Sequence, residues 1–342
     1  MTVISAVVTG LRILTLHARR QREETSVATP ASAFAVIVRA PGEIAFDRLD
    51  LVAPGDADVI VAVDWSGIST GTERLLCSGR MPPFPGLGYP LVPGYESVGR
   101  IVAAGRDSGR HAGERVFVPG SQSFRDARGL FGATASHLVV PSTKAIAVDD
   151  AWGERATLLA LAATAHHALA ANDARVPELI VGHGVLGRLI ARIAVARGAT
   201  PTVWEKNAAR LGGASGYTVL SPDEDARRDY RCIIDASGDA ALMDALIARL
   251  AFGGELVLAG FYEAPIAFAF PPAFMREARL RIAAEWKPAD LAAVTAMVRK
   301  GTLSLDELIT HRASAADAPA AYDTAFGDQN CLKMILDWSA LA

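Results

Sequence analysis

The chain has 342 residues, more than one hydrophobic core usually holds, so about two domains with a cleft between them are expected. Hydrophobic residues make up 51% and charged residues 21%, which excludes a disordered chain, and the net charge of −3 gives no basic field for nucleic acid. The three cysteines match no disulfide framework or zinc motif, which favours the cytoplasm, and no apolar run is long enough to predict a transmembrane helix.

Residues 1–33 are predicted to be an N-terminal extension. The apolar run Leu11–Leu16 precedes Arg19, Arg20 and Arg22, and no small-residue cleavage site follows, so a signal peptide is not indicated. A disordered terminus and a misassigned start codon both stay open as explanations.

From Phe34 onward, short alternating apolar runs separated by turn residues predict a β-rich domain over residues 34–151. The predicted strands are Phe34–Arg39, Ile44–Leu51, Val59–Trp65, Ser97–Ala104, Arg115–Pro119 and His137–Val140. The prolines of residues 79–94 favour an extended loop over a helix.

Beyond Trp152 strands alternate with helices over residues 152–301, which predicts a doubly wound parallel sheet of the Rossmann type and an α/β fold class. The predicted helices are Ala156–Ala171, Val185–Arg197 and Ala240–Leu250, and the predicted strands are Leu179–Val181, Pro201–Glu205, Cys232–Ala236 and Glu255–Ala259. Residues 302–342 are predicted to return to the first domain, ending in a helix and the strand Lys333–Asp337.

A glycine-rich turn, Gly182-His183-Gly184-Val185-Leu186-Gly187, joins a predicted strand to a predicted helix. Gly182 permits the tight turn, Gly184 leaves room for a pyrophosphate, and Gly187 lets the helix lie close to the sheet. Val185 and Leu186 open the helix, whose first N–H groups attract the diphosphate. We therefore predict a pyridine-nucleotide site.

Glu205, at the end of the next predicted strand, is placed to accept hydrogen bonds from the adenosine ribose, which favours NAD over NADP. Lys206 and Arg210 keep NADP open, since a nearby cation offsets the repulsion of a 2′-phosphate. Further cofactor contacts are predicted at the ends of two later strands, where a plain strand-ending turn is the alternative: Ala236, Ser237 and Gly260.

Three segments of the β-rich part carry a family resemblance: residues 65–73 (WSGISTGTE), 80–90 (RMPPFPGLGYP) and 92–99 (VPGYESVG). Together they resemble the 3-hydroxyethyl bacteriochlorophyllide a dehydrogenases of bacteriochlorophyll synthesis, a family of the medium-chain dehydrogenase/reductase superfamily. The resemblance covers Phe34 to Trp338. It implies a GroES-like catalytic domain and NAD-dependent oxidation of a 3-(1-hydroxyethyl) group to 3-acetyl.

Zinc members of that superfamily carry a cysteine ligand where this chain has Ser69 and a histidine ligand where it has Tyr95. The third ligand position falls near Ala160. Because zinc needs three protein ligands, no metal is expected, although the adjacent His166 and His167 keep the question open.

Without zinc, a hydroxyl relay is the simplest acceptor of the alcohol proton. The candidates are Ser69, Thr70, Thr72 and Tyr95. Glu73 or Glu96 is placed to orient the relay. For Glu96, a buried structural carboxylate paired with backbone or an arginine is the alternative.

A flat tetrapyrrole with a propionate edge fits an aromatic cleft with a cation at its rim. Met81, Phe84 and Tyr89 are predicted to form the walls, and Arg80 or Arg74 the rim, unless these arginines are ordinary solvated charges. Two other functions stay open: a zinc-free NAD(P)H quinone or enone reductase, and a non-catalytic nucleotide-binding scaffold. A homodimer is one alternative for the oligomeric state.

Overall fold

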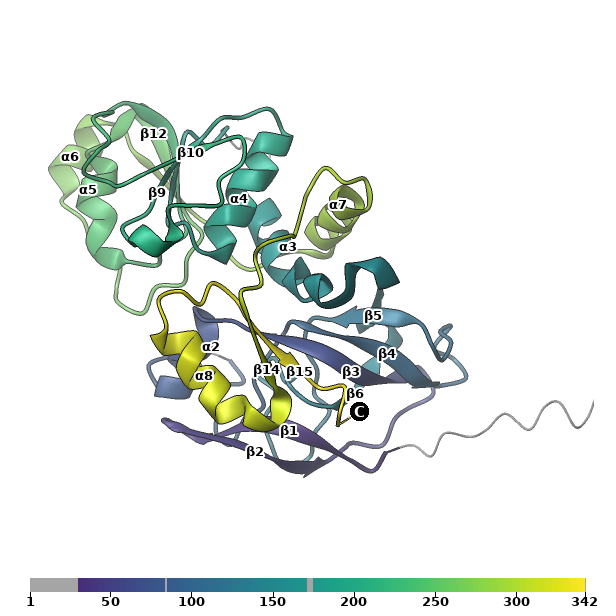
Figure 1. Cartoon of the computed structure of the whole chain (residues 1–342). Coiled ribbons are helices and arrows are strands. Elements are labelled where there is room, and N and C mark those ends of the chain that lie inside the picture. Colours follow the sequence, from purple (N-terminus) through teal and green to yellow (C-terminus); the bar gives the residue numbers. More distant parts are fainter. Residues whose placement is uncertain (1–29, 84, 171–174, 342) are drawn as a thin grey trace, which may run out of the picture. The chain divides into compact units, whose positions relative to one another are not determined.

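The structure is a computed structural model that describes residues 30–83, 85–170 and 175–341 (Figure 1). The predicted extension over residues 1–33 therefore lies almost entirely outside the described residues. A two-stranded sheet of β1 (Ser32–Ala40) and β2 (Glu43–Asp50) opens the described part. Two larger sheets follow.

A seven-stranded sheet is built from residues at both ends of the described chain. Its order is β14-β15-β3-β4-β5-β7, with β6 paired to β3. The bounds are β3 (Asp58–Ile68), β4 (Ser97–Ala104), β5 (Arg115–Val118), β6 (His137–Pro141), β7 (Ile146–Ala147), β14 (His311–Ser314) and β15 (Met334–Asp337). Helices α2 (Thr72–Ser78) and α8 (Ala318–Gly327) belong to the same part. Because β15 pairs antiparallel with β3, the C-terminal segment lies in the same sheet as the first strands.

A six-stranded sheet in the order β10-β9-β8-β11-β12-β13 holds the middle of the chain, and all its strand pairs are parallel. The strands are β8 (Leu179–Val181), β9 (Thr202–Trp204), β10 (Thr218–Leu220), β11 (Tyr230–Asp235), β12 (Leu250–Leu258) and β13 (Arg279–Ile282). The helices are α3 (Leu159–Ala168), α4 (Val185–Ala196), α5 (Met243–Ile247), α6 (Phe270–Met275) and α7 (Pro288–Arg299). The strand order reverses at β8, and ligands bind at the carboxyl ends of the strands at such a point.

The α/β fold class is confirmed, and most predicted strands lie where the alternating pattern put them. Two predicted helices are wrong in extent. Residues 150–158 are a 3₁₀ stretch and α3 covers only Leu159–Ala168, while the helix predicted over Ala240–Leu250 ends at Ile247 because β12 begins at Leu250. The short elements β10, α6 and β13 were not predicted, since three to six residues show too little periodicity.

Apolar side chains from both parts form buried cores, with β3 and β4 at the centre of one and β8, β11 and β12 at the centre of the others. None of the helices in the described ranges is long and apolar enough to cross a membrane.

Candidate active site

Three hydroxyl groups meet where β3 ends. The Ser69 Oγ and Tyr95 OH atoms are hydrogen-bonded, and Tyr95 OH lies 3.5 Å from Thr72 Oγ1, at the long end of the hydrogen-bonding range. Thr70 lies half-buried in the turn before α2. The fold therefore gathers the hydroxyls of Ser69 and Thr72 around that of Tyr95.

Glu73, in the first turn of α2, holds Ser69 through the backbone. Its Oε1 accepts a hydrogen bond from the Ser69 N–H at 3.1 Å, and its Oε2 accepts one from the Tyr322 hydroxyl of α8 at 2.5 Å. Glu73 and Tyr322 are both 0% exposed. Burial raises the pKa of Glu73 to about 7, against the two hydrogen bonds, which lower it.

Glu96 follows Tyr95 and forms a buried ion pair with Lys333, the residue before β15. Burial raises the pKa of Glu96, and the Lys333 ammonium opposes that shift. Gly67 of β3 leaves room for the pair, because a Cβ at Gly67 would overlap Glu96 Oε2 and lie 2.9 Å from Lys333 Cε. The partner of Glu96 is thus a lysine, whereas the sequence suggested backbone or an arginine.

The Glu96 carboxylate also acts on its neighbour Tyr95. Burial raises the pKa of the Tyr95 hydroxyl, and the nearby Glu96 charge raises it further. The phenol therefore stays neutral at physiological pH. A neutral hydroxyl both donates and accepts, so Tyr95 is suited to pass a proton rather than to keep one.

The zinc-ligand positions that the resemblance implies fall at Ser69, at Tyr95 and near Ala160, which is buried in α3. His166 Nδ1 and His167 Nδ1 lie 2.7 and 2.8 Å from the two carboxylate oxygens of Asp290 in α7. These histidines therefore tie α3 to α7. Within residues 30–341, apart from the undescribed positions, no group of three or more His, Cys, Asp or Glu side chains is placed to hold a metal.

The residues predicted to form the walls of the substrate cleft differ in how deeply they are buried. Met81 is only 8% exposed and packs in the core, so it offers little surface to a ligand, contrary to the expectation of a cleft wall. Tyr89 is half-buried and its hydroxyl donates to Leu76 O at 2.6 Å. Phe84 lies outside the described residues.

The two candidate rim arginines have protein partners. Arg80 pairs with Glu263 at 3.2 Å, with both side chains about half exposed, and Arg74 donates to Phe326 O at 2.6 Å. Arg80 thus links the loop after α2 to the loop after β12. Each guanidinium has five N–H donors, so these contacts leave donors for a propionate.

The glycine turn has the geometry that dinucleotide binding needs. Gly182 has φ +96°, which favours glycine, and Gly184 forms the N-cap of α4 with nothing within 4 Å of a Cβ built on it. A Cβ on Gly187 would overlap the Gly182 carbonyl oxygen, so only glycine lets α4 lie this close. Val185 and Leu186 open the helix. The space at Gly184 therefore fits a diphosphate at the helix N-terminus.

Glu205 directly follows β9 and is 8% exposed. Its two carboxylate oxygens accept the backbone N–H groups of His183 at 3.0 Å and Asn207 at 2.8 Å. Each oxygen can accept a second hydrogen bond, so the carboxylate keeps capacity for ribose hydroxyls.

His183 holds the loop that follows Glu205. Its Nδ1 lies 2.6 Å from Arg210 O and its Nε2 lies 2.8 Å from Tyr217 OH. A carbonyl only accepts, so Nδ1 carries the proton and Nε2 accepts from Tyr217. Burial lowers the pKa of His183 to about 4, which keeps the ring neutral. Arg188 of α4 adds hydrogen bonds to Arg210 O and Gly212 O.

The predicted contacts after β11 and β12 lie close together. Asp235 accepts from the Ser237 N–H and hydroxyl and from the Tyr262 hydroxyl. Gly260 approaches Gly238 so closely that a Cβ on Gly260 would lie 2.5 Å from the Gly238 nitrogen. Ala236 and Ser237 are at the carboxyl end of β11, next to Gly182, as a cofactor contact requires.

The sequence did not point to Tyr322, Lys333 or the loop role of His183. Tyr322 and Lys333 lie in the C-terminal segment, and no local pattern connects them to residues 69–96. A signal for Lys333 does exist, because a lysine at the start of an apolar strand pattern needs a buried acidic partner.

Comparisons with known proteins identify the relatives of this chain. Residues 55–150 match the alcohol dehydrogenase GroES-like domain. The 2-desacetyl-2-hydroxyethyl bacteriochlorophyllide A dehydrogenase of Cereibacter sphaeroides is 55% identical over 90% of this chain and 99% of its own length. The enzyme of the same name from Rhodobacter capsulatus is 56% identical over 89% of this chain and 97% of its own.

Solved structures share the fold at lower identity. An alcohol dehydrogenase from Escherichia coli CFT073 in complex with NADH has a TM-score of 0.75 at 18% identity, covering 90% of this chain and 100% of that one. A proposed zinc-binding dehydrogenase from Sinorhizobium meliloti 1021 bound to NADP has a TM-score of 0.76 at 21% identity, covering 90% of this chain and 100% of that one.

Proposed function

We propose a reaction from the premise that this chain belongs to the family of the 2-desacetyl-2-hydroxyethyl bacteriochlorophyllide A dehydrogenases. In this proposal the chain oxidises the 3-(1-hydroxyethyl) group of a bacteriochlorophyllide to a 3-acetyl group with NAD. The chain is a dehydrogenase of the medium-chain type that acts in bacteriochlorophyll biosynthesis. The observation that carries the proposal is 55% identity across nearly the whole length of such an enzyme.

The choice of NAD is supported by Glu205. A carboxylate that already binds two backbone N–H groups is fixed in place at the end of β9, where it repels a 2′-phosphate. Bound NAD supplies the acceptor for the hydride that leaves the carbinol carbon. The turn at Gly182, Gly184 and Gly187, with Val185 and Leu186, would hold the diphosphate, and Ala236, Ser237 and Gly260 would contact the nicotinamide half.

The chain's own residues take the hydroxyl proton in this proposal. Ser69 and Tyr95 contact the alcohol, and the half-buried Thr72 passes the proton on to solvent water. Glu96 orients Tyr95 through its pairing with Lys333. No metal takes part, because Ser69, Tyr95 and Ala160 at the ligand positions offer neither thiolate, imidazole nor carboxylate.

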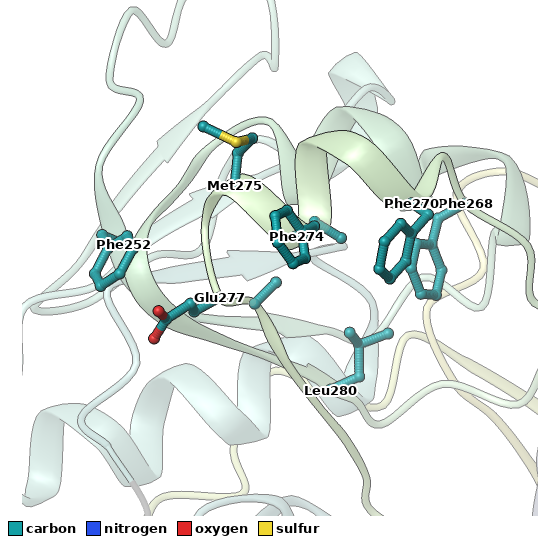
Figure 2. Close-up of a pocket in the computed structure, with 9 residues that line it drawn as sticks. Phe252, Phe268, Phe270, Phe274, Met275, Glu277 and Leu280 are labelled. Carbon is teal, nitrogen blue, oxygen red and sulfur yellow. The ribbon is translucent and has the colours of Figure 1, made fainter.

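We assign the protein to the cytoplasm, since its three cysteines are free and buried. We also propose a homodimer formed by the edge of the parallel sheet. β13 is the last strand of that sheet, and the residues around it expose large apolar side chains over a hollow of about 470 Å³ (Figure 2). Those over the hollow are Phe252, Phe268, Phe270, Phe274, Met275 and Leu280, and Ile282 is exposed further along β13.

A second copy of this chain is the binding partner that suits this face. An unpaired edge strand can join an identical edge antiparallel across a two-fold axis, which continues the sheet into the partner. Leu280 and Ile282 lie on one face of β13, so antiparallel pairing places them beside side chains on the same face of the second copy.

The test of the catalytic proposal is a pigment assay. Enzyme dialysed against a chelator is incubated with NAD and 3-hydroxyethyl bacteriochlorophyllide, and we expect the 3-acetyl pigment, with a red-shifted spectrum, and NADH in equal amounts. Values of kcat/KM for NAD should exceed those for NADP, and Glu205→Ala should narrow the preference.

Three outcomes contradict parts of this proposal. Unchanged pigment together with rapid reduction of quinones or enones identifies a reductase instead. Equal use of NADP removes the role of Glu205. Loss of activity on chelation, restored by zinc, removes the metal-free relay.

A further inference from the structure

Glu73 is a buried carboxylate that no feature of the proposed reaction uses directly. It connects three separate elements, since it lies in α2, accepts from Tyr322 of α8 and accepts from the backbone of Ser69 after β3. The Ser69 side chain on the other side of that backbone is hydrogen-bonded to Tyr95. The position of Ser69 against Tyr95 therefore depends on the acceptor capacity of Glu73.

The ionised form of Glu73 holds Ser69 more firmly than the protonated form. A carboxylate has two acceptor oxygens, one for the Ser69 N–H and one for the Tyr322 O–H. When the carboxyl is protonated, the Tyr322 hydroxyl can turn and accept from it, but the backbone N–H of Ser69 can only donate. Protonation thus leaves the Ser69 N–H with a neutral acceptor in place of a charged one, which weakens that buried hydrogen bond.

We propose that Glu73 is a positioning residue of the dehydrogenase site, whose ionised carboxylate, held by Tyr322, fixes Ser69 for the hydroxyl relay. The inference rests on the proposed function, because it takes the hydroxyl relay to serve the alcohol oxidation proposed above. It adds a control point: oxidation requires Glu73 to be ionised, so the relay is assembled at alkaline pH and loosened at acidic pH.

The groups that act on Glu73 come from every element around it. Burial raises its pKa to about 7, Tyr322 and the Ser69 N–H lower it, Glu96 raises it and Lys333 lowers it. Cys77 on the same helix stays protonated, because burial and the Glu73 charge raise the pKa of its thiol. The balance places the ionisation of Glu73 within the physiological range.

The experiment compares pH profiles of kcat for the wild type, Tyr322→Phe, Glu73→Gln and a matched control. The wild type should lose activity below an acidic limb near pH 7. Tyr322→Phe removes a hydrogen bond that favours the ionised carboxylate, so its limb should move up by roughly one pH unit while the alkaline plateau survives. Glu73→Gln should lose the limb and about tenfold to a hundredfold in kcat at all pH values, because Ser69 is misplaced.

Tyr230→Phe is the matched control. The buried Tyr230 hydroxyl also donates to a carboxylate, Asp225, at 2.6 Å, but it lies in the parallel sheet away from the relay. The acidic limb of the pH profile of Tyr230→Phe should coincide with that of the wild type. The NAD Kd of each variant, measured by NADH fluorescence or calorimetry, should stay within about twofold and verifies that the variant is folded.

The outcomes separate the inference from the function it rests on. A wild type that converts pigment while the Tyr322→Phe limb stays in place overturns the inference alone. If the wild type oxidises a different secondary alcohol, the proposed substrate is wrong and the same profiles are measured with that alcohol. If Glu73→Gln does not fold, the comparison of Tyr322→Phe with Tyr230→Phe decides.

Discussion

Lys333 shows how a single buried charge is maintained in this fold. Lys333 is 1% exposed and its partner Glu96 is 0% exposed, so neither charge is solvated by water. Each ion offsets the desolvation of the other, and removing one partner is far more costly than removing both. Gly67 is part of the same arrangement, because any side chain there would displace the pair.

We predict that Lys333→Met lowers the free energy of unfolding by about 3–5 kcal/mol, because it leaves Glu96 buried and unpaired. Urea denaturation followed by circular dichroism measures the change. The double variant Glu96→Gln with Lys333→Met removes both charges and should recover most of the loss. A double variant no more stable than Lys333→Met would mean that the pair is not the source of the effect.

The glycine turn and the loop after β9 act as one element. The turn supplies His183, whose ring holds Arg210 and Tyr217, while Glu205 at the start of the loop accepts the His183 N–H. In place of a long crossover helix, residues 206–217 contain only the 3₁₀ turn Ala208–Arg210. Side-chain hydrogen bonds from His183 and Arg188 therefore order this loop, in place of the backbone hydrogen bonds of a helix.

We predict that His183→Ala raises the Kd for NAD about thirtyfold, since two hydrogen bonds of about 1 kcal/mol each no longer order the loop before binding. Calorimetric titration with NAD measures the effect. Tyr217→Phe deletes one of the two hydrogen bonds and should give an intermediate value. An unchanged Kd in His183→Ala would show that the loop does not contribute to binding.

At the scale of the whole molecule, an exposed apolar face lies beside β13 in the part of the chain that the structure describes. Phe252, Phe274, Met275 and Ile282 are each at least 65% exposed. Monomers seldom expose so many large apolar side chains in one place, and such faces mark interfaces. Because β13 is an edge strand of the sheet, a second copy of the chain can pair with it and extend the sheet at this face.

We predict that Ile282→Asp converts the dimer to a monomer, because it places a charge in the apolar contact and repels its own copy across the two-fold axis. Analytical ultracentrifugation over a range of protein concentrations measures the mass. Leu211→Asp, an equally drastic change at another exposed apolar residue, should leave the dimer intact. A monomeric wild type would contradict the interface.

Much of the fold follows from local features of the sequence. The strands β1, β3, β4 and β8 coincide closely with runs of alternating or continuous apolar residues, because the period of side-chain direction is a property of the backbone itself. The glycine turn was located for the same reason. Positive φ at Gly182 and the close approach at Gly187 are demands of the backbone that only glycine meets.

The tertiary structure decided which side chains share the site. Ser69, Thr72 and Tyr95 were grouped from the resemblance, but their hydrogen bonds depend on β3, α2 and β4 meeting. Tyr322 is 249 residues from Glu73, and no sequence period links positions so far apart. A buried charge finds its partner only when strands from distant segments pair, so the pairing of Lys333 with Glu96 could be learned only from the folded chain. The same holds for the burial of Met81 in the core.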